Sequence, residues 1–158
     1  MSQTSSPPLT SILSTQPVRC YKKEVKLSQE VTGVLRALGV EALYLFGSRA
    51  QGNAASSSDF DFGLLFEDGK LPRSQCGEEY QKIYDLLQDC VTVTTDIDIV
   101  FLEQAPLQLR YHVVRYGQVL LDANPLKRGR FEERTAEEHA DFEPYRRLFE
   151  EATLARIG

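Results

Sequence analysis

Apolar and polar residues alternate along this 158-residue chain in blocks that have the lengths of helices and strands. Apolar side chains recur every three or four residues from Val31 to Leu38, which predicts a helix that begins near Ser28 and ends at Gly39. Four apolar runs of strand length follow, at 42–46, 60–66, 97–102 and 119–121. This order of elements is typical of a small α/β or α+β domain with a mixed sheet of three or four strands flanked by helices.

Further helices are expected between and after these runs. Residues 76–90 have helical spacing, and Pro106 is suited to the first position of a helix that Gly117 ends. After Asn124 the chain becomes strongly charged, and we expect a helical C-terminal tail whose last helix starts at Pro144. The expected organisation is a flexible tail over residues 1–23, a domain over 24–123 and a helical extension over 124–158.

The helical extension carries an apolar stripe at near-helical spacing. Its members are Phe142, Tyr145, Leu148, Phe149, Ala152 and Ile157. Two interpretations are open: the stripe packs on its own domain, as most such stripes do, or it docks on a partner protein.

Composition excludes several classes of protein. A hydrophobic content of 42% is too high for a wholly disordered chain, and a net charge of −5 makes direct nucleic-acid binding unexpected. The sequence shows no apolar run of the roughly 20 residues that cross a bilayer and no signal-peptide pattern, so we expect a cytoplasmic protein without a membrane contact. Three cysteines that lie far apart favour reduced thiols over disulfides or a zinc site.

Two carboxylates stand at alternate positions where the 60–66 run begins. Side chains two apart on a strand share a face, so Asp59 and Asp61 should lie together while Phe60 and Phe62 enter the core. Adjacent carboxylates raise each other's pKa, and a cation between them relieves the repulsion. Magnesium commonly takes one or two carboxylates together with substrate phosphates, so the pair predicts a magnesium site.

A small, polar segment follows the 42–46 run directly. Gly47 lets a ligand approach the backbone, and the N–H groups there, with the Ser48 hydroxyl, are suited to a phosphate, particularly if a helix begins at this point. Arg49 adds a positive charge, although it could instead pair with a structural carboxylate. The lysine of a Walker A loop and the GxGxxG pattern are both absent, which excludes those two nucleotide sites.

A third carboxylate lies on a later strand. Asp98 stands between Ile97 and Ile99, where an unpaired charge is costly. If this strand neighbours that of Asp59 and Asp61, the three carboxylates can hold two metal ions about 3.5–4 Å apart. Asp96 shares the face but lies at the strand entrance, so we favour Asp98. The two histidines of the chain have no suitable nucleophile nearby, which disfavours a hydrolase.

These residues resemble a known family. Gly47-Ser48, ten residues and then Asp59-x-Asp61 resemble the GS-x10-DxD signature of DNA polymerase β-like nucleotidyltransferases. Gly47-Ser48-Arg49-Ala50-x-Gly52, with the later Asp98-x-Val100 and Gln104-Ala105-Pro106, is similar to the minimal nucleotidyltransferase (MNT) branch. The resemblance spans residues 28–122, and the chain departs from it at Gln51, where many relatives carry arginine or lysine.

The resemblance implies a nucleotidyltransferase fold and transfer of AMP from ATP to a hydroxyl, with release of pyrophosphate. It assigns the nucleotide to Gly47, Ser48 and Arg49. It assigns two Mg²⁺ ions to Asp59, Asp61 and Asp98, the last of which would also help to deprotonate the acceptor. MNT proteins are commonly antitoxins that attach AMP to a tyrosine of a HEPN-domain ribonuclease toxin, which is the partner that the resemblance implies. Two alternatives stay open: an aminoglycoside-type small-molecule nucleotidyltransferase, and a non-catalytic antitoxin that acts by binding.

Overall fold

The computed structural model describes residues 25–52, 54–55 and 58–157. In chain order the elements are α1 Gln29–Ala37, β1 Val40–Phe46, α2 Gly47–Gln51, β2 Phe60–Phe66, α3 Glu78–Cys90, β3 Ile97–Phe101, α4 Leu107–Tyr116, β4 Gln118–Asp122 and α5 Pro125–Ile157. The four strands form one sheet in the order β3-β2-β1-β4, which is the mixed sheet that the sequence predicts. The flexible tail expected over residues 1–23 lies outside the described residues.

The pairing of the strands brings three strand ends to one edge of the sheet. β1 runs antiparallel to β2 and to β4, whereas β2 and β3 are parallel and are joined through α3. Phe46 at the end of β1 is paired with Asp61, and Asp61 is in turn paired with Asp98 of β3. The end of β1 and the starts of β2 and β3 therefore lie together, and the candidate residues are found at this edge.

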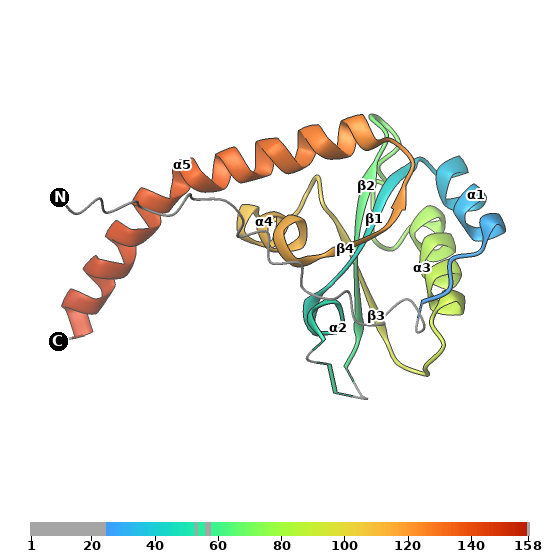
Figure 1. Cartoon of the computed structure of the whole chain (residues 1–158), viewed down its shortest axis with the longest axis horizontal. Helices are drawn as coiled ribbons and strands as arrows, with labels where there is room; N and C mark the ends of the chain where they lie inside the picture. The colour runs from blue at the N-terminus through green and yellow to red at the C-terminus, as the bar shows by residue number, and fades with distance from the viewer. Residues whose placement is uncertain (1–24, 53, 56–57, 158) are drawn as a thin grey trace, which may run out of the picture.

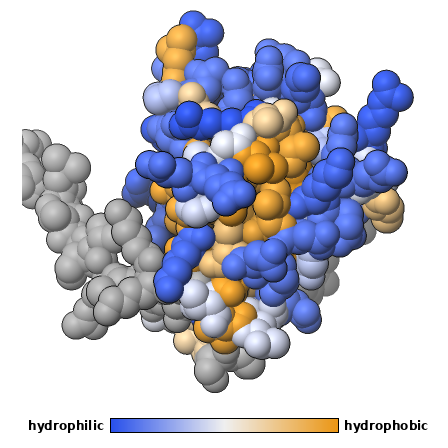
Figure 2. Space-filling view, turned by 90° about the vertical axis from the view of Figure 1, so that its right-hand side faces the viewer, coloured by the Kyte–Doolittle hydropathy of each residue, from blue (hydrophilic) through white to orange (hydrophobic). Residues whose placement is uncertain are grey.

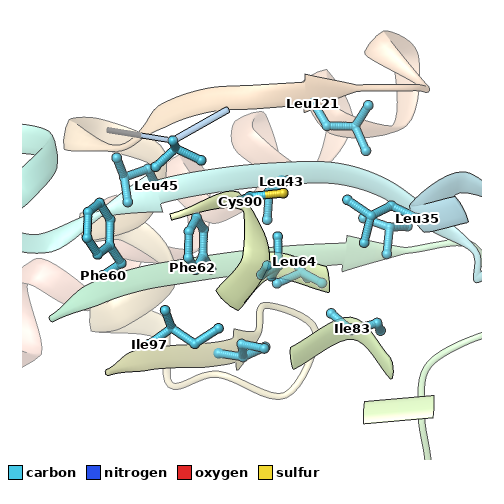
Figure 3. Packing of buried hydrophobic residues seen from close by; sticks show 14 of the residues in the cluster. Leu35, Leu43, Leu45, Phe60, Phe62, Leu64, Ile83, Cys90, Ile97 and Leu121 are labelled. Atoms are coloured by element: carbon cyan, nitrogen blue, oxygen red, sulfur yellow. The ribbon is translucent and has the colours of Figure 1, made fainter. Parts of the chain in front are cut away.

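One face of the sheet is covered by α1 and α3 (Figure 1). Phe60, Phe62 and Leu64 point from β2 into this layer and are fully buried. Figure 3 shows Ile83 of α3 and Leu35 of α1 beside them, over the same strands. The alternation of β2 is therefore as predicted, and the odd-numbered residues of its first half are left for the opposite face.

The opposite face of the sheet is covered by α4 and α5. Tyr44 and Leu65 are buried there against Val113 of α4, with Phe131 of α5 packed at the margin. Pro106 precedes α4 as its N-cap residue instead of being its first helical residue, a shift of one position from the prediction. Gly117 ends α4 as predicted, and a side chain there would collide with the carbonyl oxygen of Val113.

α5 differs from the sequence prediction in two ways. It is one helix of 33 residues, so Pro144 lies inside it and does not start a new helix. Figure 1 shows α5 bending toward its C-terminal end, which is the usual effect of a proline that lacks the N–H for one helical hydrogen bond. The apolar stripe, moreover, is exposed: Phe149 retains 69% of its accessible surface and Tyr145 retains 61%. Of the two interpretations left open, the exposure of Phe149 and Tyr145 does not support packing of the stripe on its own domain.

The surface of the described part is otherwise ordinary. The face of α1 and α3 shows mostly hydrophilic side chains with an apolar band between them (Figure 2). None of the described helices is both long enough and apolar enough to cross a bilayer. Cys76 and Cys90 are free thiols, as expected, and Cys20 lies outside the described residues.

Candidate active site

The glycine-serine turn and the second carboxylate of the Asp-x-Asp pair are in direct contact. β1 ends at Phe46 and α2 begins at once with Gly47, whose φ is +73°. A Cβ atom built on Gly47 would overlap the Asp61 carboxylate, so that carboxylate lies against the glycine backbone. Only glycine tolerates both the left-handed φ and the close approach, which explains why the turn begins with this residue.

Asp59 and Asp98 complete a group of acidic residues around Asp61. Asp98 is the register partner of Asp61 on β3, and Asp59 stands two residues before Asp61, just ahead of β2. Burial raises the pKa of Asp61, and the nearby charges of Asp98 and Asp59 raise it further. Asp59 and Asp98 are exposed, so the group is open to solvent from one side.

The chemistry of this group fits a hard divalent cation completed by phosphate oxygens. Asp61 is half-buried next to the charges of Asp98 and Asp59, and a cation bound between the three carboxylates would relieve this repulsion. Among the residues that the structure describes, however, no three acidic, histidine or cysteine side chains converge as a ready-made metal site. Mg²⁺ suits such an arrangement, because it takes few protein ligands and fills its remaining coordination positions with water or substrate phosphate.

Arg49 has a different environment from the one expected of a phosphate ligand. Only 3% of its surface is exposed, and its guanidinium lies 4.1 Å from the centre of the Phe60 ring. Nε and one terminal nitrogen donate to the carbonyl oxygen of Ser58, at 2.8 and 2.6 Å. Arg49 thus ties α2 to the residue that precedes Asp59, and the structure does not present its charge on the open side of the site.

Ser48 and Gly52 shape the rest of the turn. Ser48 follows Gly47 in the first turn of α2, where backbone N–H groups have no helical acceptor of their own. Gly52 ends α2 in the left-handed conformation, and its N–H donates to the Ser48 carbonyl oxygen. Gly47 and Ser48 are therefore held beside Asp61 by a short helix with a defined start and end.

Three further side chains at this edge were not predicted. The Thr95 hydroxyl donates to Asp59 Oδ1 at 3.3 Å, and so fixes the first carboxylate from the entrance of β3. Gln51 Nε2 lies 3.3 Å from His112 Nε2, which connects α2 to α4. Neither contact could be predicted from the sequence, because each depends on which elements lie next to β2 and α2 in the fold.

The chain is similar to a known family and to several solved structures. It matches the family described as "Polymerase beta, Nucleotidyltransferase" over residues 29–126, which is more than half of its length and includes every candidate residue. The chain belongs to this family. No curated protein gave a significant match.

Solved structures with this fold include chains of toxin–antitoxin complexes. A chain in the crystal structure of a toxin–antitoxin with AMP-PNP is 25% identical, with a TM-score of 0.61 over 80% of this chain and 99% of that one. A chain in the MntA-HepT toxin–antitoxin structure is 22% identical, with a TM-score of 0.55 over 80% and 99%. The third comes from a complex of a tri-AMPylated Shewanella oneidensis HEPN toxin with an MNT antitoxin, at 22% identity and a TM-score of 0.55 over 81% and 99%.

Proposed function

We propose that this nucleotidyltransferase is an antitoxin that transfers AMP from ATP to a tyrosine hydroxyl of a HEPN-type ribonuclease toxin. The observation that carries the proposal is the contact of the Asp61 carboxylate with Gly47, beside the Asp98 partner on β3. The Gly47-Ser48 turn, to which we assign the triphosphate, thus lies at the same open edge as the carboxylates to which we assign the metal ions. The toxin–antitoxin complexes among the structures with this fold, one with AMP-PNP and one with an AMPylated toxin, support the choice of nucleotide and acceptor.

The residues of the edge have separate tasks in this reaction. The N–H groups of Gly47 and Ser48 bind the triphosphate and orient its α-phosphorus toward the acceptor. Asp59, Asp61 and Asp98 would hold two Mg²⁺ ions, which supply charge neutralisation to the triphosphate when bound. Arg49 is a positioning residue, because it holds Ser58 and with it the approach to Asp59.

The chemical step is a displacement at the α-phosphorus of ATP. The tyrosine oxygen forms a bond to the α-phosphorus while the bond from that phosphorus to the bridging oxygen breaks, and pyrophosphate leaves with both of its phosphorus atoms. Asp98 accepts the tyrosine proton and, because it is exposed, can pass the proton to water. The products are the tyrosine–AMP phosphodiester, pyrophosphate and one proton.

Mass spectrometry of a co-expressed HEPN toxin tests the proposal. We expect one or more AMP adducts on tyrosine with the wild-type chain and none with Asp59→Asn/Asp61→Asn, although both versions fold. Gln51→Ala is the matched control at the same edge, because the contact recorded for its side chain is with His112 of α4. A toxin left unmodified by the wild type, with ATP and Mg²⁺ present, would overturn the proposal.

The same experiment separates the other functions. A stable complex without an adduct favours an antitoxin that acts by binding alone. Nucleotide incorporation into an aminoglycoside, without modification of the toxin, favours a small-molecule acceptor.

A further inference from the structure

The C-terminal part of α5, which we call the arm (residues 142–154), has an unusual surface. Its exposed apolar side chains are Phe142, Tyr145, Leu148, Phe149 and Leu154, which are half of the large hydrophobic side chains that the described residues expose. A shallow hollow on the arm is lined by Phe142, Arg146, Phe149, Glu150, Thr153 and Leu154, all from α5 itself. An apolar strip of this kind on a helix is typical of a docking surface for another protein.

Among the described residues, the recorded contacts between α5 and the domain lie in the first half of α5. Arg128 pairs with Asp122 at 3.0 Å and with Glu132 at 2.6 Å, and the Tyr44 hydroxyl donates to the same Glu132 oxygen at 2.8 Å. Farther along, Arg110 pairs with Glu138, and the His139 ring stacks on Tyr111 of α4 at 3.6 Å between centroids. Beyond His139, the interactions of the arm that the structure records are between residues of α5 itself.

The charges of the arm favour a protein partner over a polyanion. Arg146 pairs with Glu143 at 2.9 Å and with Glu150 at 3.5 Å, and Arg147 pairs with Glu143 at 3.3 Å. These arginines are therefore neutralised within the helix and do not form a basic strip. Nucleic acid and anionic membranes attract unneutralised lysine and arginine side chains, so neither fits this surface.

The size of the arm disfavours a second copy of the chain as its partner. Thirteen helical residues are about 20 Å long, and a helix is about 10 Å across, so the contact strip measures roughly 200 Å² in plan. A stable interface buries about 800 Å² on each partner. Two arms packed on each other would bury much less than this area. A partner that binds stably must therefore contact more of the molecule than the arm.

The arm lies where a partner that binds it would also reach the active-site edge. α4 and α5 cover the face of the sheet toward which Asp61 and Asp98 point, since their neighbours in β2 and β3 are buried on the other face. Figure 1 shows α5 crossing over the sheet, passing α4 and then bending downward beyond the domain, so that its C-terminal end lies at the height of α2. A protein seated on the arm and against α4 is therefore brought toward Gly47 and the carboxylates.

We infer that the arm is the docking surface for the AMP acceptor protein, whose own apolar helical surface packs on Phe142, Tyr145 and Phe149. This inference rests on the proposed function, because that function requires a second protein at the active-site edge. The arm raises the local concentration of the acceptor tyrosine and contacts neither the nucleotide nor the reacting atoms. It therefore acts on the KM for the acceptor and leaves kcat unchanged.

A charge placed in the apolar strip tests the inference. Phe149→Asp should weaken binding of the purified full-length chain to its cognate HEPN toxin by at least tenfold, because a buried aromatic anchor carries much of the energy of such a contact. Glu151→Lys is the matched control, because residue 151 lies about 200° round the helix from residue 149. Both variants should keep the circular dichroism, the melting temperature and the ATP affinity of the wild type, because both side chains are exposed and, among the described residues, no contact of Phe149 outside α5 is recorded.

The outcomes distinguish this inference from the proposed function. Loss of toxin binding in Phe149→Asp alone supports the inference, even if the wild type transfers no AMP and the proposed chemistry fails. Equal toxin binding by wild type and Phe149→Asp would overturn it, as would the absence of toxin binding by the wild type. A wild-type dimer that Phe149→Asp converts to a monomer, measured by light scattering, would assign the arm to self-association instead.

Discussion

Gly47 is the residue on which the geometry of the site depends most directly. In Gly47→Ala the new methyl group would overlap the Asp61 carboxylate, and a φ of +73° disfavours any side chain. We expect the carboxylate to be displaced, and AMP transfer to fall by two orders of magnitude or more. Steady-state kinetics with ATP and Mg²⁺ measures the effect.

The matched control for this change is Gly33→Ala. Gly33 lies on α1 with open space around it, so alanine should leave transfer unchanged and stabilise the helix by about 0.5–1 kcal/mol. If Gly47→Ala retained wild-type transfer, the contact between the turn and Asp61 would have no catalytic role.

Asp61 should make the protein less stable as pH rises when no divalent cation is present. Its pKa is raised in the folded state, so the fold binds the proton more tightly than the unfolded chain does. The stability contributed by the protonated form is complete below the ordinary value of 3.8 and is lost as pH rises through the folded-state pKa. Asp61→Asn removes this loss, and should therefore be more stable than wild type at pH 7 in a chelator, by up to about 1 kcal/mol.

Thermal melts across pH measure this effect, and addition of Mg²⁺ provides the control. Mg²⁺ should raise the melting temperature of the wild type but not that of Asp61→Asn, because binding to the folded state stabilises it. An Asp61→Asn variant that is less stable than wild type at pH 7 would show that the carboxylate has a structural partner.

The positions of the acidic residues were easier to predict from the sequence than the environment of Arg49. Period-two alternation is a local property, so the shared face of Asp59 and Asp61 followed from their spacing. The environment of Arg49 depends on the packing of Phe60 beneath it and on the position of the Ser58 carbonyl, which no local pattern encodes. A charged residue next to a phosphate-binding turn is therefore ambiguous from sequence alone.

At the scale of elements, α5 consists of two parts with different stability. The first part is held by the Tyr44–Glu132–Arg128 contacts, whereas the ion pairs recorded for the arm among the described residues are within α5 itself. Isolated helices shorter than about 12–15 residues are marginal in water, and Pro144 removes one hydrogen bond at the start of the arm. We expect amides of the arm to exchange hydrogen at least tenfold faster than those of residues 128–138.

Pro144→Ala tests the cause of this difference. Alanine restores the missing N–H and is favoured over proline in a helix interior by about 3 kcal/mol, so helix content should rise and exchange in the arm should slow. Exchange in residues 128–138 serves as the internal control and should not change. Equal exchange in both parts of wild-type α5 would contradict the division.

The lengths of the elements were largely predictable, but their ends and partners were not. Each of the four apolar runs forms a strand, because a strand of this length is encoded by its own residues. The prediction that a helix starts at Pro144 was wrong, because a helix can continue past a proline when the residues on both sides favour a helix and the bend faces solvent. The exposure of Phe149 could not be predicted from the sequence either, because an apolar stripe shows that a helix has an apolar side but not what covers that side.

At the scale of the whole molecule, the site exists because of topology. The parallel pairing of β2 and β3 through α3 sets Asp98 beside Asp61, and the antiparallel pairing of β1 with β2 sets Gly47 beside Asp61. Pairing between strands separated by a helix is a long-range property, so the sequence pattern alone did not show whether the strand of Asp98 neighbours that of Asp61. The resemblance to a family implied that it does, and the register of β2 and β3 confirms that the two strands are neighbours.

Because the proposed chemistry and the proposed docking surface lie on different elements, their effects should be separable in cells. When the HEPN toxin is induced, Asp61→Asn should fail to protect growth at any expression level although it still binds the toxin. Phe149→Asp should fail at low expression and recover at high expression, since a catalyst with a raised KM is rescued by a higher concentration. Growth curves over a range of inducer, with toxin adducts followed by mass spectrometry, measure both. Full protection by Asp61→Asn, with no adduct on the toxin, would mean that occupation of the toxin through the arm is sufficient, and that the carboxylate edge is not needed for neutralisation.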